Sequence, residues 1–171
     1  QTKRALIIAN GTYTDQHIAP LLGVYEDQKA VEQMLKAQGY TTTAVVDGNR
    51  EQMITALNQL IKDSGEDDSV LIYYAGHGTV KSQSSVGYWF PIDASLVRKN
   101  GQRPETTWMS SIDVANFISG IKAKQILLVS DSCFSGSLSY ETALQREPEL
   151  PSNAVLKRRS VMVMTSGSEE L

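Results

Sequence analysis

The sequence contains three short segments with an unbroken apolar centre, each of which ends abruptly in a polar or small residue. They span residues 4–10, 70–75 and 125–130. Strands that are buried on both faces have this composition, whereas strands with one face in water alternate apolar and polar residues. Residues 41–47 and 161–164 are rich in β-branched or apolar residues, as is typical of two further strands. The chain is therefore predicted to contain a central sheet that is covered on both sides.

Between these strands, apolar residues recur at intervals of three or four, which places them on one face of a helix. The first predicted helix ends before Gly39, and the second and third are predicted to be capped by Asn49 and Ser110. The residues expected on the apolar faces are Ala30, Val31, Met34 and Leu35 in the first helix, Met53, Ile54, Leu57, Leu60 and Ile61 in the second, and Ile112, Ala115, Phe117 and Ile118 in the third. Strands that alternate with helices pair in parallel through right-handed crossovers. The predicted fold class is α/β, a three-layer αβα sandwich with a mostly parallel central sheet, in a single domain spanning residues 1–171.

Composition excludes several classes of function. A net charge of -3 and a pI near 5.4, without a stripe of basic residues, argue against a nucleic-acid partner. We expect no membrane partner, since no apolar stretch approaches the roughly 18 residues of a membrane span. One cysteine forms no internal disulfide, and with only two histidines a Cys/His zinc site is not expected. A cytoplasmic location is the expectation that follows from this cysteine usage.

Two of the predicted strands end in residues that carry chemistry. The segment 70–75 leads into Gly76-His77-Gly78, and the segment 125–130 leads into the only cysteine, Cys133. The carboxyl ends of parallel strands lie along one edge of the sheet, so these side chains are expected to meet although 56 positions separate them. An imidazole that takes the proton of a thiol creates a strong nucleophile, and glycines allow backbone N–H groups to approach a developing oxyanion. We therefore predict a cysteine hydrolase, with the amides of Gly78 and Cys133 as the oxyanion site.

Each candidate residue also has a purely structural interpretation. Cys133 alone would usually be a small buried apolar residue and His77 a loop histidine, but their paired positions at strand ends favour catalysis. Asp131 is expected on the same strand face as Cys133, where it either lines a substrate pocket or accepts backbone N–H groups. His17 is interpreted as a surface residue. The acidic run at residues 66–68 is interpreted as a solvated turn, with a calcium site as the alternative.

The two motifs resemble those of the caspase-like cysteine peptidases, peptidase family C14, and in particular the metacaspase and bacterial orthocaspase branch. The resemblance rests on Tyr73-Tyr74-Ala75-Gly76-His77-Gly78 and on Asp131-Ser132-Cys133-Phe134-Ser135-Gly136, and it covers residues 4–167. A histidine about 50 residues before the cysteine is a known caspase pattern. The resemblance implies a caspase-like fold and a His77–Cys133 dyad that hydrolyses peptide bonds through an acyl-enzyme, without a metal in the bond-breaking step. It also implies cleavage after Arg or Lys, with Asp131 and Asp27 as the acidic pocket.

The resemblance and the composition together give expectations for the remainder of the chain. Residues 1–171 are expected to contain the large-subunit portion and the start of the small-subunit portion, with residues 137–159 as an exposed intersubunit loop. Arg146, Lys157, Arg158 and Arg159 are the candidate self-cleavage positions. A small-subunit chain or a further C-terminal segment is expected to complete the fold, and calcium is retained as an alternative activator. The competing functions are a catalytically silent caspase-like scaffold and a nucleotide-binding domain, but no Gly-x-Gly-x-x-Gly motif follows the first strand.

Overall fold

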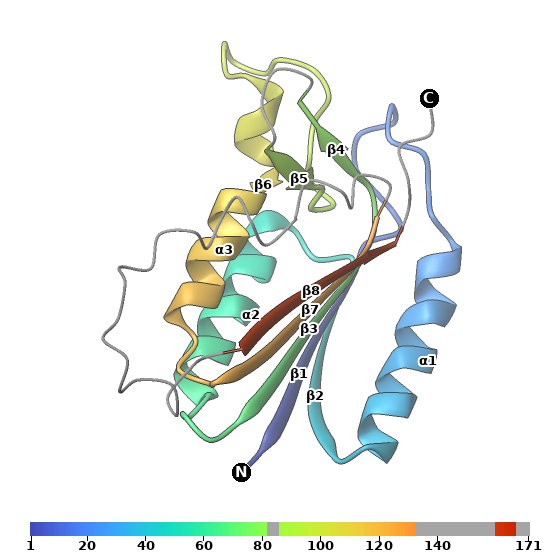
Figure 1. Cartoon of the computed structure of the whole chain (residues 1–171). Coiled ribbons are helices and arrows are strands. Elements are labelled where there is room, and N and C mark those ends of the chain that lie inside the picture. The colour runs from blue at the N-terminus through green and yellow to red at the C-terminus, as the bar shows by residue number, and fades with distance from the viewer. Residues whose placement is uncertain (82–85, 133–159, 167–171) are drawn as a thin grey trace.

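The computed structural model describes residues 1–81, 86–132 and 160–166. In this part of the chain, a five-stranded sheet has the order β2, β1, β3, β7, β8 (Figure 1). The strands are β1 (Lys3–Ala9), β2 (Tyr40–Val46), β3 (Ser69–Ala75), β7 (Gln125–Asp131) and β8 (Ser160–Ser166). Every neighbouring pair in this sheet is parallel. The predicted parallel sheet is confirmed.

Helices cover both faces of the sheet. Helix α1 (Gly23–Ala37) lies on one face, and helices α2 (Arg50–Asp63) and α3 (Ser111–Gly120) lie on the other (Figure 1). Successive residues of a strand point to opposite faces, and two apolar clusters accordingly share the sheet. Leu6 and Ile8 of β1 belong to the cluster beneath α2 and α3, whereas Ala5 and Ile7 belong to the cluster beneath α1. The predicted three-layer sandwich is confirmed.

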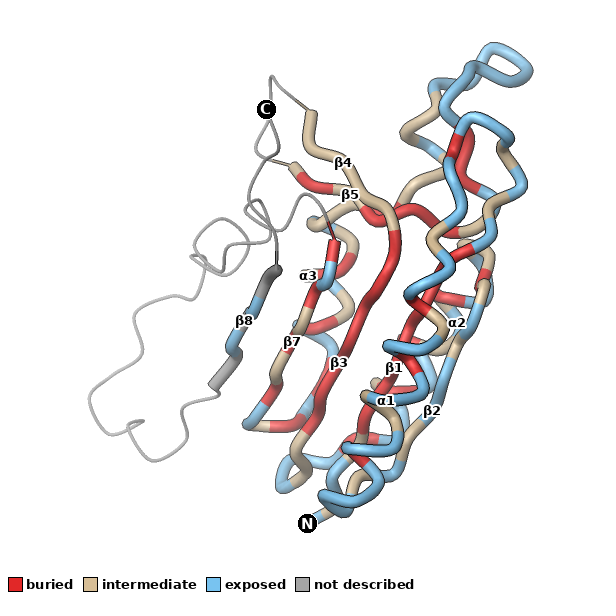
Figure 2. Tube along the Cα trace, turned by 90° about the vertical axis from the view of Figure 1, so that its right-hand side faces the viewer, coloured by how far each residue is buried: buried red, intermediate tan, exposed pale blue. Residues whose placement is uncertain are grey.

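The central strands form the most deeply buried part of the structure. Ile7, Ile8 and Ile72 have 0% exposure, and the tubes of β1 and β3 are almost entirely buried in Figure 2. Full burial of one such side chain contributes about 1.5–3 kcal/mol. Two adjacent strands with unbroken apolar centres therefore fix the middle of the sheet, and their carboxyl ends are held rigidly at its upper edge.

Both predicted helix caps are present. The side chain of Asn49 accepts a hydrogen bond from the N–H of Gln52 at 2.8 Å, and the side chain of Gln52 accepts from the N–H of Asn49 at 2.9 Å. This reciprocal pair is a capping box. The hydroxyl of Ser110 likewise accepts from the N–H of Asp113 at 3.0 Å, at the start of α3. Removal of such a cap typically costs about 1 kcal/mol.

The buried faces of α1 and α3 agree with the predicted ones only in part, since Leu35 and Ile118 are buried as predicted. Met34 in α1 is 55% exposed and Ile112 in α3 is 56% exposed, whereas Val24, Gln28 and Val114 are buried. In α3, residues two positions apart point to nearly opposite sides, so burial of Val114 turns Ile112 outward. In α1, the polar Gln28 is accommodated because its amide donates to Glu32 Oε2 at 2.6 Å. A search for apolar periodicity does not detect a buried glutamine. The predicted buried face of α1 was therefore shifted away from Gln28.

A small antiparallel sheet lies above the central sheet. It consists of β4 (Gly78–Val80), β5 (Gly87–Trp89) and β6 (Met109–Ser110), with the short helix η1 (Pro104–Thr107) between β5 and β6. Gly78 pairs with Trp89 and Thr79 with Tyr88. Strand β4 begins immediately after His77, so the small sheet holds the histidine loop from above.

None of the helices among the described residues is both long enough and apolar enough to cross a bilayer.

Candidate active site

The carboxyl ends of β3 and β7 lie side by side at the upper edge of the central sheet. Ala75 is opposite Asp131 in the β3–β7 register, and the N–H of Gly76 donates to the carbonyl of Asp131 at 3.4 Å. The segments that follow these strands contain His77 and Ser132. The strand that leads to the candidate nucleophile and the loop that holds the candidate base are thus direct neighbours.

The ring of His77 is oriented by a backbone carbonyl. Its Nε2 atom lies 2.7 Å from the carbonyl oxygen of Ala19, in the loop between β1 and α1. A carbonyl only accepts hydrogen bonds, so Nε2 carries the proton of the neutral ring, and Nδ1 has the free lone pair. Among the described residues, Nδ1 has no hydrogen-bond partner in this structure. His77 is therefore in the tautomer that can act as a base through Nδ1.

The backbone of His77 is held by two tyrosine hydroxyls. Its N–H donates to the hydroxyl of Tyr13 at 2.8 Å, and its carbonyl accepts from the hydroxyl of Tyr74 at 2.6 Å. The same carbonyl accepts from the N–H of Phe90 at 3.0 Å. A Cβ atom on Gly76 would lie 2.6 Å from the Tyr74 hydroxyl and 3.0 Å from the Tyr13 hydroxyl. Glycine is therefore required before His77 so that both hydroxyls can reach the loop.

Tyr13 remains protonated at neutral pH, as its role requires. Burial raises the pKa of its phenol to about 12. The neutral hydroxyl donates to the carbonyl of Asn10 at 3.0 Å while it accepts from the N–H of His77. Both capacities of this hydroxyl are used, and the tyrosine joins the end of β1 to the histidine loop.

The loop that contains Ala19 is anchored at two positions that precede the contact with His77. Ile18 is 6% exposed and belongs to a small apolar cluster with Phe90 and Ala94. Asp15 accepts the N–H of Leu96 at 2.8 Å, and this bond is the main cause that lowers the pKa of the Asp15 carboxyl to about 2. The Ala19 carbonyl thus has a fixed position relative to the sheet.

The other end of the same loop is tied to β2. Asp47 follows β2 and accepts the N–H groups of Gly11 and Thr12 at 2.9 and 3.1 Å. Its second oxygen accepts from the hydroxyl of Tyr25 at 2.7 Å. Asp47 has a φ of 52°, a left-handed conformation that aspartate tolerates better than most residues. The β1–α1 loop is therefore held by charge-assisted bonds from a residue outside it.

His17 lies in the same loop, and its ring pairs with Asp15. Its Nδ1 atom is 2.7 Å from Asp15 Oδ1, and its side chain is 56% exposed. This placement agrees with its interpretation as a surface residue.

The two acidic residues expected in the substrate pocket influence the same tyrosine. Asp131 is the last residue of β7, Asp27 lies in the first part of α1, and both are exposed. Burial, followed by the negative charges of Asp131 and Asp27, raises the pKa of Tyr73 to about 12. Tyr73 belongs to the apolar cluster on the α1 face of the sheet. The structure thus places both carboxylates within electrostatic reach of one point on the α1 face.

Several predicted site residues lie outside the described residues. These are Cys133 and the four candidate self-cleavage positions, Arg146, Lys157, Arg158 and Arg159. Gly78, expected to supply an oxyanion-binding amide, is the first residue of β4 and lies opposite Trp89.

The acidic turn before β3 is engaged in structural contacts. Asp68 accepts the N–H groups of Thr2 and Gly65, both at 2.9 Å, and pairs with Arg4 Nε at 3.2 Å. Within the described ranges, no group of three or more His, Cys, Asp or Glu side chains is arranged to hold a metal ion. The prediction of a solvated acidic turn is therefore correct for Glu66 and Asp67, which are exposed, but wrong for Asp68, which fixes the turn.

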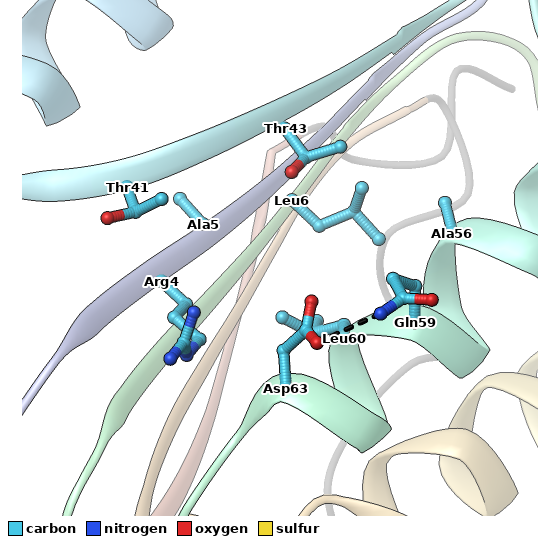
Figure 3. Close-up of a pocket in the computed structure, with 9 residues that line it drawn as sticks. All are labelled: Arg4, Ala5, Leu6, Thr41, Thr43, Ala56, Gln59, Leu60 and Asp63. Carbon is cyan, nitrogen blue, oxygen red and sulfur yellow. Dashed lines mark hydrogen bonds between the residues drawn. The ribbon is translucent and has the colours of Figure 1, made fainter.

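A cavity of about 100 Å³ lies between α2 and the strands β1 and β2, away from the histidine loop. It is lined by Arg4, Ala5, Leu6, Thr41, Thr43, Ala56, Gln59, Leu60 and Asp63 (Figure 3). Arg4 and Thr41 are register partners near the start of their strands, whereas His77 follows the end of β3. Gln59 donates to Asp63 at 2.9 Å beside this space. The cavity is small, has no histidine or cysteine in its lining, and is separate from the candidate active site.

Sequence reasoning missed Tyr13, Ala19 and Tyr73. Tyr13 and Ala19 act on His77 from 64 and 58 positions away, and no local pattern identifies them. The sequence identifies Tyr73 only as part of a motif. Its usable signal is that it is an aromatic strand residue whose position in the sequence lies between Asp27 and Asp131.

Comparisons with known proteins agree with this geometry. The family model of the peptidase C14 caspase domain matches residues 2–170. Among solved structures, the crystal structure of protein GSU0716 from Geobacter sulfurreducens is similar, with a TM-score of 0.66. The two sequences are 14% identical, and the match covers 99% of this chain and 74% of that chain. At this identity the similarity establishes the fold alone. A search of curated proteins gave no significant match.

Proposed function

The chain belongs to the caspase-domain family of peptidases, and from this premise we propose that it is a cysteine endopeptidase with His77 and Cys133 as its catalytic dyad. The observation that carries the proposal is the register of β3 and β7, in which Ala75 is opposite Asp131. His77 comes two residues after Ala75, and Cys133 comes two residues after Asp131. Neighbouring strands are about 4.8 Å apart, and this spacing of the described strand ends supports a base and a nucleophile that meet at this edge.

The tautomer of His77 gives each atom a role. Nδ1 accepts the proton of the Cys133 thiol, and the thiolate attacks the carbonyl carbon of the substrate. The resulting oxyanion is bound by the amides of Gly78 and Cys133, as the sequence predicts. The imidazolium then gives its proton to the leaving amine, which leaves a thioester. Water attacks the thioester while His77 takes one of its protons; the thiolate then leaves, the imidazolium returns the proton to it, and the carboxylic acid is released.

The proposed specificity is for Arg or Lys on the amino side of the cleaved bond. It is supported by the positions of Asp131 and Asp27, whose negative charges both act on Tyr73 and contribute to its raised pKa. Tyr73 packs on the α1 face of the sheet. A guanidinium forms bidentate hydrogen bonds with carboxylates, so Arg is expected to be cleaved better than Lys. The alternative role of Asp131, a carboxylate bonded to backbone N–H groups at the strand end, predicts no such preference.

Self-processing between residues 137 and 159 is part of the same proposal, since an enzyme that cleaves after Arg or Lys can act on Arg146, Lys157, Arg158 or Arg159. We also propose that a small-subunit chain or further C-terminal segment completes the domain. The exposure of Met162 and Met164 on β8, at 58% and 53%, supports an additional covering layer there. The metacaspase or orthocaspase branch, a cytoplasmic location, a protein or peptide substrate, and calcium as an activator at most are proposed on the sequence motifs.

A catalytically silent scaffold is the second function considered. A scaffold has no need for a histidine whose tautomer is fixed by the carbonyl of Ala19 and whose backbone is held by Tyr13 and Tyr74. These three contacts, which orient one loop histidine, favour the enzyme over the scaffold.

A covalent peptide probe tests the proposal. A peptidyl acyloxymethyl ketone that ends in Arg is expected to alkylate the purified protein once, with release of its carboxylate leaving group, and the matched Asp probe is expected to react far more slowly. Cys133→Ala should prevent labelling, and His77→Ala should slow it. Equal labelling of Cys133→Ala and the native chain would contradict the assignment.

A further inference from the structure

We propose that Trp89 is a positioning residue that fixes both the backbone of His77 and the residue that precedes Cys133. The inference deepens the proposed function and rests on it. Trp89 is the last residue of β5 and is 1% exposed. Its indole contacts one residue near the end of β3, Tyr74, and one near the end of β7, Ser130.

The contact toward the histidine runs through Tyr74. The rings of Trp89 and Tyr74 are stacked, with centroids 4.3 Å apart and planes inclined by 11°. The hydroxyl of Tyr74 donates to the carbonyl of His77 at 2.6 Å. Tyr74 is fully buried, so its ring has no alternative position that avoids Trp89. A shift of the indole is therefore transmitted to the backbone of His77.

The contact toward the cysteine runs through two serines. Nε1–H of Trp89 donates to the hydroxyl of Ser130 at 3.1 Å, and the Ser130 hydroxyl is 3.0 Å from the hydroxyl of Ser132. Ser130 is 0% and Ser132 is 6% exposed. Ser132 is covalently joined to Cys133, so the direction in which the chain leaves Ser132 sets the direction in which it enters Cys133. The indole thus fixes the residue immediately before the nucleophile.

The polar part of this network is unusual for the centre of an apolar core. Ser130 interrupts the apolar centre of β7 on the α2 and α3 side of the sheet, between buried Leu128 and the strand end. An alanine at Ser130 would fill nearly the same space without any need for a hydrogen bond. Buried hydroxyls and an indole N–H are costly unless paired, so their pairing here specifies one arrangement of the strand end.

Trp89→Phe separates positioning from simple core packing. Phenylalanine keeps a ring against Tyr74 but removes the N–H that binds Ser130. The control is Trp108→Phe, because the chain has only two tryptophans and Trp108 also donates its N–H, to the carbonyl of Ser95 at 3.0 Å. That carbonyl lies in the loop after β5 rather than at the end of β7.

Two measurements on the folded variants test the inference. The first is hydrolysis of a fluorogenic Arg peptide, for which Trp89→Phe is expected to lower kcat about 10- to 100-fold with KM within about threefold, since small displacements of catalytic groups have effects of this size. The second is the rate of alkylation by iodoacetamide from pH 5 to 9, which reports on Cys133 alone because it is the only cysteine. In Trp89→Phe, the midpoint of the curve of alkylation rate against pH is expected to move toward the value near 8.5 of a free thiol. Trp108→Phe should leave both measurements unchanged.

Native kcat and a native alkylation profile in folded Trp89→Phe would overturn the inference, as would equal losses in Trp108→Phe. If Trp89→Phe does not fold, Ser132→Ala replaces it, and the same losses are expected from the opposite end of the network. If the native chain cleaves no peptide, the proposed function fails, but the alkylation profiles still decide whether Trp89 positions the cysteine.

Discussion

The backbone N–H of His77 donates a hydrogen bond of 2.8 Å to the hydroxyl of Tyr13, a residue 64 positions earlier in the chain. This hydroxyl also donates to the carbonyl of Asn10, so it ties the histidine loop to the end of β1. The candidate base is therefore held by its backbone as well as by the bond from its ring to Ala19.

The first prediction concerns this bond. Tyr13→Phe leaves the N–H of His77 without an acceptor, which is expected to reduce the free energy of unfolding by about 1–3 kcal/mol. The resulting freedom of the loop should also lower kcat. Urea unfolding and peptide hydrolysis measure the two effects. Tyr40→Phe is the control, since Tyr40 begins β2 at the opposite edge of the sheet. Equal activity in the two variants would contradict a role for Tyr13 at the site.

Gly76→Ala is predicted to disturb the same loop from inside. Its new Cβ would lie 2.6 Å from the hydroxyl of Tyr74, a buried side chain with no room to withdraw. Overpacking of this kind costs about 1–3 kcal/mol, and here it displaces the hydroxyl that holds the carbonyl of His77. Thermal unfolding and peptide hydrolysis should both show losses. Gly65→Ala is the matched variant, because its nearest neighbour would be at 3.7 Å, and it should behave like the native chain.

How far the sequence predicts this molecule depends on the range of the interactions involved. The strands β1, β3 and β7 lie within one residue of their predicted limits, because an unbroken apolar centre has no stable alternative to burial in the sheet. The caps at Asn49 and Ser110 were predicted because a capping side chain bonds to a residue only three positions away. These features depend on residues that are close in the sequence, so local sequence patterns predict them.

The site's supporting contacts were not predictable in this way. Ala19 contacts His77 through a backbone oxygen, which any residue would supply, so its side chain holds no signal. Tyr13 and Trp89 form hydrogen bonds with residues far away in the sequence, and only the tertiary structure brings these partners together. The outward turn of Ile112 has the same cause, since only the position of α3 against the sheet decides that Val114 is buried in its place.

The third prediction concerns the acidic pair. A charged hydrogen bond is worth about 1.5–3 kcal/mol, so Asp131→Asn and Asp27→Asn should each lower kcat/KM for Arg peptides about 10- to 100-fold. Matched fluorogenic peptides with Arg, Lys or Asp at the cleaved position give the comparison. Glu26→Gln is the control, because Glu26 is exposed beside Asp27 and pairs with Lys29 at 3.6 Å. Preferential cleavage after Asp would refute the acidic-pocket hypothesis.

The fourth prediction is self-cleavage. Incubation of the active protein should produce a cut after Arg146, Lys157, Arg158 or Arg159, detected by intact-mass and peptide mass spectrometry. The Cys133→Ala protein should stay intact alone and should be cut when a trace of active protein is added. If active protein shows no cut between residues 137 and 159, processing is excluded for this chain, while the peptidase assignment stands.

The most direct test of the dyad is the turnover of one fluorogenic Arg peptide by three purified proteins, the native chain, Cys133→Ala and His77→Ala, with circular dichroism to verify that each is folded. Members of a dyad act as a unit, so each substitution is expected to lower kcat by several orders of magnitude while the fold is retained. Turnover by either folded variant at a rate close to that of the native chain would contradict the assignment of His77 and Cys133 as the catalytic residues.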